Sequence, residues 1–593
     1  MNLPSIDSLM GPARYGVNLY INDNSAEIDF NLPMIIDVET DEKDNFVGYA
    51  ITQNGTDIYY FTTLGKYWSE KLKFIGHNLK FDIKQLIGWG ISIKPEQYFG
   101  DTCLMSYVQN TTKETHSLKD LAKEYLGMEW STYKEMVGTG KNKVTLDKQP
   151  VDKVAAYCGM DCLATYKLHE FLQKKLTLQQ KRYLETIELP TARVLMEMEL
   201  KGVQVDVEYL EKLDATFDQQ RYGLMYKVQE QWEKIPKLQK DLTRDKKDNT
   251  FNINSNLQIA NLLQAQGAIL PKTPKGNLKV DKATLEQWKH LPVVPCLLEY
   301  SKIEKLKSTY TETLLEKQKD GRIYANFNQL ARNNKGQSVG ISTGRLSSNN
   351  PNLQNIPAKS EEGKLIRKAF VAGNDKVFID ADFSQIEPRL VAHFSKDPLF
   401  LAAFNEQRDI YADLVEGTGR NRNDGKTFML ALLYGAQPKK LASVFKCTEQ
   451  EAENIVKKIM SKLPGVTAWI NRTKYEAHQK KGVWTLFKRW IPLPLINSDD
   501  RYERMHWERV AVNSVIQGSA AEIMKLGLIK LKEAGYMPVL TVHDEFLIEI
   551  TDNKLGLETG HVNLIKNVLE SIVKIDVPLK VEIGIGKNWG DAK

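Results

Sequence analysis

The chain lacks the features that mark several specialised classes of protein. Its five cysteines are scattered and form no Cys-x-x-Cys pair, which excludes a disulfide framework and favours reduced thiols. No apolar run approaches the roughly 18 residues that span a bilayer. The N-terminal sequence MNLPSIDSLM has no basic stretch followed by an apolar core. We therefore expect neither a secretory signal nor membrane insertion.

A strong excess of one charge is also missing. The net charge of +6 and the pI of about 8.6 permit nucleic-acid binding, but many other enzymes share these values. The 593 residues are 42% hydrophobic, which is enough apolar material for large cores and too long a chain for a single core. The sequence therefore predicts at least two domains.

The first 175 residues alternate between strand-like and helix-like segments, which predicts an α/β domain. The segment FVGYAITQNGTDIYYFTT reads as two strands around an Asn54-Gly55 turn. The segment HSLKDLAKEYLG reads as a helix that ends at Gly127.

Acidic residues follow the strand-like and helix-like segments of this first domain. In MIIDVET, Asp37 and Glu39 are two residues apart, so a strand places both on one face. Asp82 lies on an expected helix with Asn78 one turn earlier, and Tyr157 and Asp161 share a helical face. Such clustered carboxylates suit Mg²⁺ or Mn²⁺.

A second acidic pair lies far downstream. The apolar run KVFIDAD ends in Asp382 and leads into an expected helix with Pro388 near its first turn. The segment PVLTVHDEFLIEI reads as two strands with Asp544 at the turn between them. Two carboxylates on adjacent strand ends can hold two metal ions for phosphoryl transfer. The sequence thus predicts two separate metal-dependent sites.

Between the downstream acids lies RNDGKTFMLALLYGAQ. Arg422, Lys426, Leu430 and Tyr434 recur every four residues, so a helix places them along one face. Two cations and an aromatic ring on one face suit the phosphates and the base of a nucleoside triphosphate. Taken alone, however, this segment is better explained as an amphipathic helix with chance basic residues.

Five sequence blocks together resemble family A DNA polymerases of the Klenow-like group. They are STGRLSSNNPNLQNIP, DFSQIEPR, RNDGKTFMLALLYG, ERVAVNSVIQGSAAEIMK and VHDE, in the family's order and spacing. The resemblance implies a right-hand polymerase with palm, fingers and thumb. It covers the chain from about residue 30 to residue 593.

The resemblance also implies a role for each matching residue. Asp382 and Asp544, with the backbone carbonyl of Phe383, would hold the two catalytic metals, and Glu387 would be a steric gate against a ribose 2′-OH. Residues implied to contact the incoming dNTP are Arg422, Lys426, Leu430, Tyr434, Glu387, Gln385 and Tyr411. Residues implied to contact DNA are Arg345, Asn352, Gln354, Arg489, Asn513, Gln517, His543 and, for the 3′ end, Asn78.

Four positions depart from the family pattern. Leu430 stands where relatives often have an aromatic residue, and Tyr411 stands where many have a phosphate-contacting His. Lys488 replaces a frequent Gly, and Pro388 replaces Leu. No metal ligand is lost, so we expect activity, with nucleotide selection open to change around Leu430 and Tyr411.

The upstream residues resemble a second family. The ordered set D-x-E, N-x₃-D and Y-x₃-D is similar to that of 3′→5′ proofreading exonucleases with the RNase H-like (DnaQ-like) fold. The similarity implies that Asp37, Glu39 and Asp161 hold metals, that Asp82 completes the carboxylate set, and that Tyr157 orients a water. All of these residues are present, so we expect active proofreading.

The two resemblances together imply a domain order. We expect an exonuclease domain at 1–175 and a polymerase domain at 176–593, divided into a thumb at about 190–320, a palm at about 321–405 and 490–593, and fingers at about 406–489. We expect no 5′-nuclease domain. KGVQVD and KLKSTY are only about a hundred residues apart, so an inserted thioredoxin clamp is not expected.

The expected partners are primer–template DNA, a single-stranded 3′ end and dNTPs, with two Mg²⁺ (or Mn²⁺) in each active site. Helicase, primase or single-strand-binding protein are candidate partners of a monomer. By analogy the compact layout suits a bacterial or phage-infected cytoplasm, or else an organelle.

Three other functions remain open from the sequence. A single-subunit RNA polymerase would have similar palm acids, but Glu387 and the exonuclease set speak against it. A nuclease whose polymerase half only grips DNA, or a non-catalytic replication scaffold, would not need the full set of downstream acids and cations.

Overall fold

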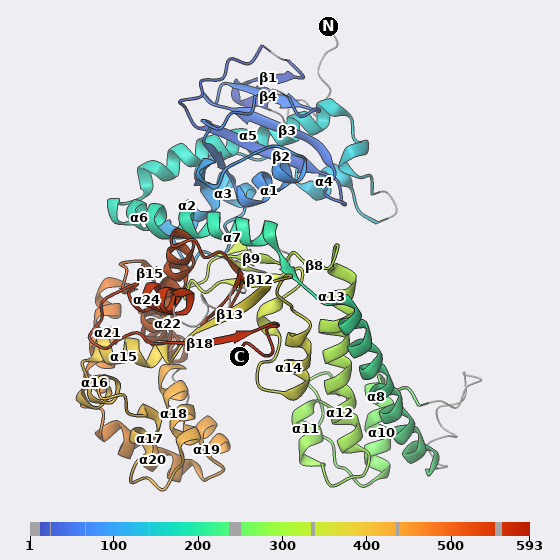
Figure 1. The fold of residues 1–593 in the computed structure, drawn as a ribbon, viewed down its shortest axis with the longest axis vertical. Helices are drawn as coiled ribbons and strands as arrows, with labels where there is room; N and C mark the ends of the chain where they lie inside the picture. The colour runs from blue at the N-terminus through green and yellow to red at the C-terminus, as the bar shows by residue number, and fades with distance from the viewer. Residues whose placement is uncertain are drawn as a thin grey trace. The chain divides into compact units, whose positions relative to one another are not determined.

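The computed structural model describes residues 12–23, 25–65, 67–140, 143–235, 251–333, 338–434, 438–551 and 560–593. The chain divides into two compact units (Figure 1). Unit 1 comprises residues 1–201, 326–349 and 379–583, and unit 2 comprises residues 202–325, 350–378 and 584–593. Among the described helices, none is both long and apolar enough to cross a bilayer.

The N-terminal part of unit 1 is built on a mixed sheet of six strands in the order β1-β4-β3-β2-β5-β6. The strands are β1 (Asn18–Ile21), β2 (Met34–Thr40), β3 (Phe46–Thr52), β4 (Asp57–Phe61), β5 (Phe74–Gly76) and β6 (Tyr98–Asp101). The predicted hairpin is confirmed, because β3 and β4 pair antiparallel. Gly55 adopts φ +68° in the turn, and the Asn54 side chain accepts the backbone N–H groups of Thr56 and Asp57.

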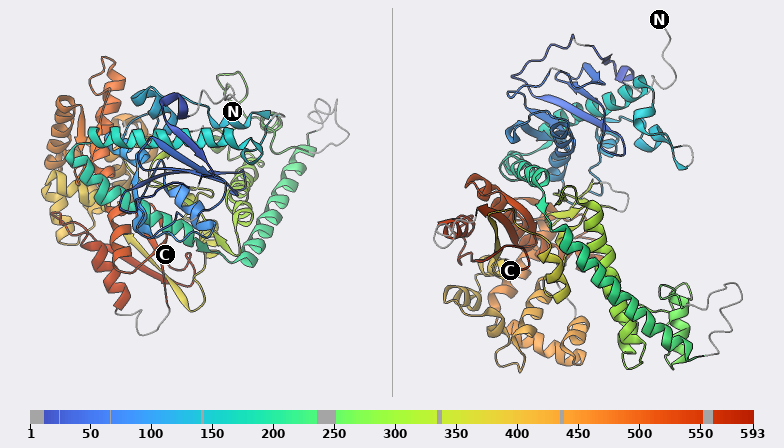
Figure 2. Two further views of the ribbon diagram at one scale, coloured as in Figure 1. Left: turned by 90° about the horizontal axis from the view of Figure 1, so that it is seen from above. Right: turned by 45° about the vertical axis from the view of Figure 1, so that its right-hand side comes forward.

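Alternate residues of β2 enter two different cores. Met34, Ile36 and Val38 pack on one side, and Ile35 packs on the side of helix α5 (Val151–Lys175). Figure 2, left, shows this long helix lying across the sheet. Since side chains alternate along a strand, Asp37 and Glu39 share the face of Ile35 and point toward α5. The remaining helices of this region are α1 (Lys80–Gly88), α2 (Thr102–Gln109), α3 (Leu118–Leu126), α4 (Tyr133–Val137), α6 (Leu178–Tyr183) and α7 (Leu189–Lys201).

Two helix ends of this region follow the sequence signals. Helix α3 ends at Gly127, which takes φ +63° as the predicted C-terminal glycine. Helix α7 ends one residue before Gly202, which takes φ +59°. A π-helical turn at Leu184–Glu188 joins α6 to α7, and this irregularity was not predicted.

The second part of unit 1 is built on a four-stranded sheet in the order β16-β17-β13-β18. Its strands are β13 (Lys376–Phe383), β16 (Pro538–Val542), β17 (Glu545–Thr551) and β18 (Val581–Gly586). The helices beside it are α15 (Ile386–Ser395), α22 (Arg501–Glu533) and α24 (Val562–Glu570). This is the segment that we expected to form the palm.

The segment expected to form the thumb falls mostly in unit 2, although α7 at its start belongs to unit 1. Helix α16 (Pro398–Asn405) ends the first expected palm segment. The segment expected to form the fingers contains the helices α17 (Ile410–Val415), α18 (Arg422–Tyr434), α19 (Pro438–Phe445), α20 (Glu449–Ser461) and α21 (Pro464–Lys480), followed by the hairpin β14 (Gly482–Trp484) and β15 (Trp490–Pro492). Unit 2 contains α8 (Val207–Glu233), α10 (Asn256–Ala265), α11 (Lys282–Gln287), α12 (Val294–Leu306), α13 (Glu312–Lys317) and α14 (Glu361–Lys368). Within it, α8 and α12 pack along each other (Figure 2).

Helix α22 carries two ion pairs that are almost entirely removed from water. Lys525 Nζ lies 2.7 Å from Glu188 Oε1, and the two side chains are 1% and 0% exposed. Arg489 Nε lies 2.8 Å from Glu522 Oε1, and both side chains are 1% exposed. Glu188 also accepts hydrogen bonds from Tyr183 and Gln329. These pairs tie α22 to segments that are distant in sequence.

Replacing Lys525 by Met should be strongly destabilising, because Glu188 would lose its cationic partner in a dry site. Breaking a buried pair in this way costs about 3–5 kcal/mol of unfolding free energy. Urea unfolding followed by circular dichroism measures the loss. The matched control is Lys530→Met on the same helix, where Lys530 and Glu533 are about half exposed. Equal midpoints for both variants would contradict the assigned role of Lys525.

Candidate active sites

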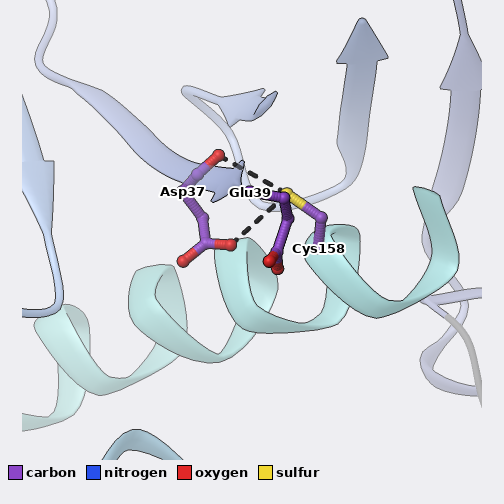
Figure 3. Close-up of side chains that lie close together, drawn as sticks. All are labelled: Asp37, Glu39 and Cys158. Carbon is purple, nitrogen blue, oxygen red and sulfur yellow. Dashed lines mark hydrogen bonds between the residues drawn. The ribbon is translucent and has the colours of Figure 1, made fainter. Parts of the chain in front are cut away.

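The upstream carboxylates converge between β2 and α5. One carboxylate oxygen of Asp37, one of Glu39 and Cys158 Sγ all lie within 4.8 Å of one another (Figure 3). The Cys158 thiol donates to Asp37 Oδ2 over 3.3 Å and so holds that carboxylate. Asp82, at the start of α1, accepts the backbone N–H of Val38 over 3.0 Å. The prediction that these acids share one site agrees with this geometry.

Without a cation, the carboxylates of this site repel one another. Burial raises the pKa of Asp37, and the nearby charge of Asp161 raises it further. Burial likewise raises the pKa of Glu39, with additional contributions from Asp37 and Asp161. Glu39 is only 9% exposed. Like charges in a desolvated site favour either protonation or a bound cation, so the carboxylates suit divalent metal ions.

Two residues that the sequence did not single out hold Asp161. Trp130 donates its indole N–H to Asp161 Oδ1 over 2.7 Å, and Lys119 Nζ lies 3.2 Å from the same oxygen. The ammonium group of Lys119 also lies 4.3 Å from the ring centroids of both Trp130 and Tyr157. Trp130 and Lys119 follow no spacing rule relative to Asp161, so only the tertiary structure identifies them.

The positions of Tyr157 and Asn78 complete this site. Tyr157 precedes Asp161 by one turn of α5 and is 8% exposed, and burial raises the pKa of its hydroxyl. Asn78 does not lie on a helix as expected. It precedes α1 with φ +63°, and its backbone N–H bonds to Asp101.

The strand ends that carry the two downstream acids lie side by side. Asp382 is the penultimate residue of β13, and Asp544 lies in the turn between β16 and β17, as predicted. The backbone N–H of Phe383 donates to the carbonyl oxygen of Asp544 over 3.0 Å, so the two strand ends are directly joined. Both Asp side chains are half-buried.

Glu387 and Gln385 lie at the start of the next helix. Glu387, in the first turn of α15, is 7% exposed and forms an ion pair with Arg345. Burial raises the pKa of Glu387, the Arg345 guanidinium opposes this shift, and the charge of Asp544 adds to it. Gln385 precedes the helix in the left-handed conformation, with φ +56°.

On the finger helices, Arg422 and Tyr411 lie together. The Arg422 guanidinium is 5.4 Å from the Tyr411 ring centroid and pairs with Asp409. The close approach depends on Gly425, where an added Cβ would lie 2.0 Å from the Tyr411 carbonyl oxygen. Lys426, one turn after Arg422 on α18, is exposed. The side chains of Leu430 and Tyr434 lie outside the described part of the structure.

The residues expected to contact DNA fall into different settings. Asn513 is half-buried on α22, Gln517 is 7% exposed one turn later, and His543 is exposed beside Asp544. Asn352 and Gln354 belong to unit 2, where the Asn352 side chain accepts the Gln354 backbone N–H.

The surroundings of Arg489 differ from those expected of a residue that contacts DNA. Its side chain is 1% exposed, and its guanidinium binds Glu522, Tyr107 and the carbonyl oxygen of Ser342. A guanidinium enclosed by protein partners does not present its charge to DNA, so the structure does not support a DNA contact by this side chain. The sequence alone gave no sign of its burial.

Comparison with known proteins agrees with these two sites. Residues 223–591 match the family model of DNA polymerase family A, and residues 33–177 match that of a 3′-5′ exonuclease. DNA polymerase I of Pseudomonas aeruginosa is 33% identical over 548 residues, which cover 88% of this chain and 57% of that protein. DNA polymerase I of Bacillus subtilis is 32% identical over 539 residues, which cover 86% and 58%. The chain thus spans little more than half the length of these relatives.

A solved structure resembles the whole chain. The POL domain of Pol1 from M. smegmatis, in complex with DNA primer-template and dNTP, matches with a TM-score of 0.78 and 27% identity, over 95% of this chain and 97% of that one. The family model alone covers more than half of the residues. The chain therefore belongs to DNA polymerase family A, and it carries a 3′-5′ exonuclease domain ahead of its polymerase region.

Proposed function

We propose that the protein is a template-directed, DNA-dependent DNA polymerase that proofreads its own product, and that it serves in replication. The observation that carries the proposal is the presence of two sets of carboxylates on two separate sheets of unit 1. One contains Asp37 and Glu39 between β2 and α5, and the other contains Asp382 and Asp544 at joined strand ends. One site would remove the primer end that the other extends.

The residues of both sites fit divalent metal ions, which family A polymerases and their exonuclease domains use. Their ligands are carboxylates, the hard oxygen donors that Mg²⁺ prefers. Asp382 and Asp544 would hold ions in the polymerase site, and Asp37, Glu39 and Asp161 would do so in the exonuclease site. We propose Mg²⁺ as the ion. When bound, it would activate the attacking oxygen and neutralise charge on the leaving group.

In synthesis, the primer 3′-hydroxyl attacks the α-phosphate of a dNTP in line, and pyrophosphate leaves. Arg422 and Lys426 are one turn apart on α18, where both can bind the triphosphate. Arg422 would exchange its pairing with Asp409 for the phosphates. Glu387, buried at the start of α15, would exclude a 2′-hydroxyl by its bulk.

In proofreading, water attacks the terminal phosphodiester of a frayed 3′ end. The Tyr157 hydroxyl is protonated at neutral pH, as in any tyrosine, and burial raises its pKa further, so it can donate a hydrogen bond to the scissile phosphate or orient the water. Trp130 and Lys119 keep Asp161 in place beside it.

We further propose primer–template DNA, single-stranded 3′ ends and dNTPs as ligands of a monomeric enzyme in a bacterial or phage-infected cytoplasm. The relative from M. smegmatis supports the first and the last of these ligands, since its structure contains primer-template and dNTP. An RNA polymerase would need room for a 2′-hydroxyl, which the buried Glu387 disfavours. A comparison of dNTP and NTP incorporation separates the two functions.

Asp544→Ala should abolish primer extension and spare 3′-end degradation, because only the polymerase site loses a metal ligand. We expect extension to fall more than about 100-fold, since even partners of metal ligands contribute 10–100-fold. A primer-extension gel measures both reactions. Asp576→Ala, at a carboxylate that is 39% exposed and pairs with Lys396, is the control and should extend normally. Normal extension by Asp544→Ala would refute the assignment.

The double variant Asp37→Ala, Glu39→Ala should show the reverse pattern. Removal of a mismatched 3′ nucleotide should fall more than about 100-fold, because two ligands of the exonuclease site are lost, while extension from a matched primer persists. Release of a labelled 3′ nucleotide measures this loss. The control is Glu42→Ala, at an exposed residue just past β2 that pairs with Lys143. Unchanged mismatch removal would exclude this site as the nuclease.

Trp130→Phe should slow mismatch removal about 10–100-fold and raise the Mg²⁺ concentration required, because Asp161 loses the donor that orients it. Polymerisation should not change. The matched control is Trp68→Phe, since among the described residues the buried indole N–H of Trp68 has no hydrogen-bond partner. A Mg²⁺ titration of both variants would count against the role of Trp130 if the two curves coincide.

A further inference from the structure

Tyr107 belongs to the exonuclease region but takes no part in its active site. It lies on α2, and its side chain is fully buried. Its hydroxyl donates to the carbonyl oxygen of Ile341 over 3.1 Å and accepts a hydrogen bond from Arg489 Nη1, also over 3.1 Å. Both partners come from the polymerase region of unit 1. The Tyr107 hydroxyl therefore links the exonuclease region to the polymerase region.

Arg489 is held firmly at this contact. Its Nε donates to Glu522 over 2.8 Å, and its Nη1 also donates to the Ser342 carbonyl oxygen over 3.0 Å. Glu522 in turn accepts from the Thr485 hydroxyl over 2.8 Å. Hydrogen bonds to charged groups in a dry site are among the stronger ones in proteins. The carbonyl oxygens of Ile341 and Ser342 are thus bound by two fixed donors.

The turn that follows packs directly on these donors. Gly344 takes φ +64°, and a Cβ there would lie 2.9 Å from Arg489 Nη2 and 3.2 Å from the Tyr107 hydroxyl oxygen. On the opposite side, a Cβ at Gly518 of α22 would lie 2.7 Å from the same Nη2. The guanidinium therefore fills the space between two glycines, and the turn has little freedom to shift.

The exonuclease region also binds the segment just before this turn. The backbone N–H of His116 donates to the Ser338 carbonyl oxygen over 2.7 Å, and the backbone N–H of Gly340 donates to the Lys113 carbonyl oxygen over 2.9 Å. The residue just after the turn is Arg345, which pairs with Glu387. A continuous set of contacts therefore leads from the exonuclease region to the residue assigned to sugar discrimination.

We propose that Tyr107 is a positioning residue of the polymerase site: with Arg489 it fixes the turn at residues 341–344, so that Arg345 holds Glu387 against the sugar of the incoming nucleotide. The inference rests on the proposed polymerase function. It assigns to a residue of the exonuclease region an effect on which nucleotide is incorporated. Loss of the hydroxyl removes one of two hydrogen bonds to the Ile341 carbonyl oxygen, which still accepts from the Gly344 backbone N–H over 3.1 Å. It also leaves one Arg489 N–H without its acceptor in a dry site. The turn is no longer tied to the exonuclease region at this point and is expected to move.

The test is Tyr107→Phe in the full-length chain, with Tyr98→Phe as the matched control. Tyr98 is a second buried tyrosine of the exonuclease region, and its hydroxyl donates to Asp101 of the same region over 2.6 Å. Single-nucleotide incorporation is measured with dNTP and with NTP, and 3′-end removal is measured on single-stranded DNA. Active-site titration normalises each rate.

For Tyr107→Phe we expect kcat/KM for dNTP to fall about tenfold, the magnitude of one lost hydrogen bond to a charged group. The preference for dNTP over NTP should narrow by about fivefold or more, and exonuclease activity should equal that of the unaltered protein. Tyr98→Phe should leave both polymerase values unchanged. A merely structural role would lower all rates in parallel and keep the dNTP to NTP ratio constant, which would overturn the inference.

A second variant approaches the same contact from the polymerase side. Arg489→Lys keeps the charge but loses the forked donors that reach Tyr107 and Ser342 together. It should also lower the preference for dNTP over NTP. In a double-mutant cycle, its effect on this preference should be non-additive with that of Tyr107→Phe. Additive effects, or an unchanged ratio in both variants, would refute the proposal. Failure of the unaltered protein to extend a primer would instead refute the proposed function.

Discussion

The desolvated charges on α22 constrain the rest of unit 1. A charge that has left water needs a partner at close range, and here each partner comes from a different segment of the chain. Glu522 pairs with Arg489, which lies in the hairpin after α21. Lys525 pairs with Glu188, which lies in the π-helical turn before α7. Because an unpaired charge in this setting is very costly, the segments that supply the partners must all reach α22 in one arrangement.

That arrangement explains how two metal-binding sets coexist in one chain. Each set gathers carboxylates where strands and helices meet, and such a gathering is unfavourable until a cation neutralises it, as the raised pKa values of Asp37 and Glu39 show. The rest of the folded chain must therefore offset the repulsion between carboxylates at both sites. The buried pairs and large apolar cores supply the rigidity that holds the acids together before any ion binds.

Much of the fold and of the site could be predicted from the sequence, because the signals are local. The alternation along MIIDVET placed Asp37 and Glu39 on one face, Asn54-Gly55 gave the hairpin, and the strand–turn–strand pattern placed Asp544 at a turn. Other features carry no local signal. Trp130 reaches Asp161 across 31 residues and Arg489 reaches Tyr107 across 382. The family resemblance implied that Arg489 contacts DNA, and only the tertiary packing shows that its side chain is enclosed.

The contact between Tyr107 and Arg489 bears on whether the two catalytic regions are independent modules. A polymerase fragment that begins after α7 would lack both Tyr107 and Glu188, so Arg489 would lose one partner and Lys525 its counter-ion. Its newly uncovered face would carry cations that the intact chain never exposes. The two regions are consecutive in sequence and have separate chemistries, yet they share one electrostatic interior, and deletion of either one is therefore a change to the other.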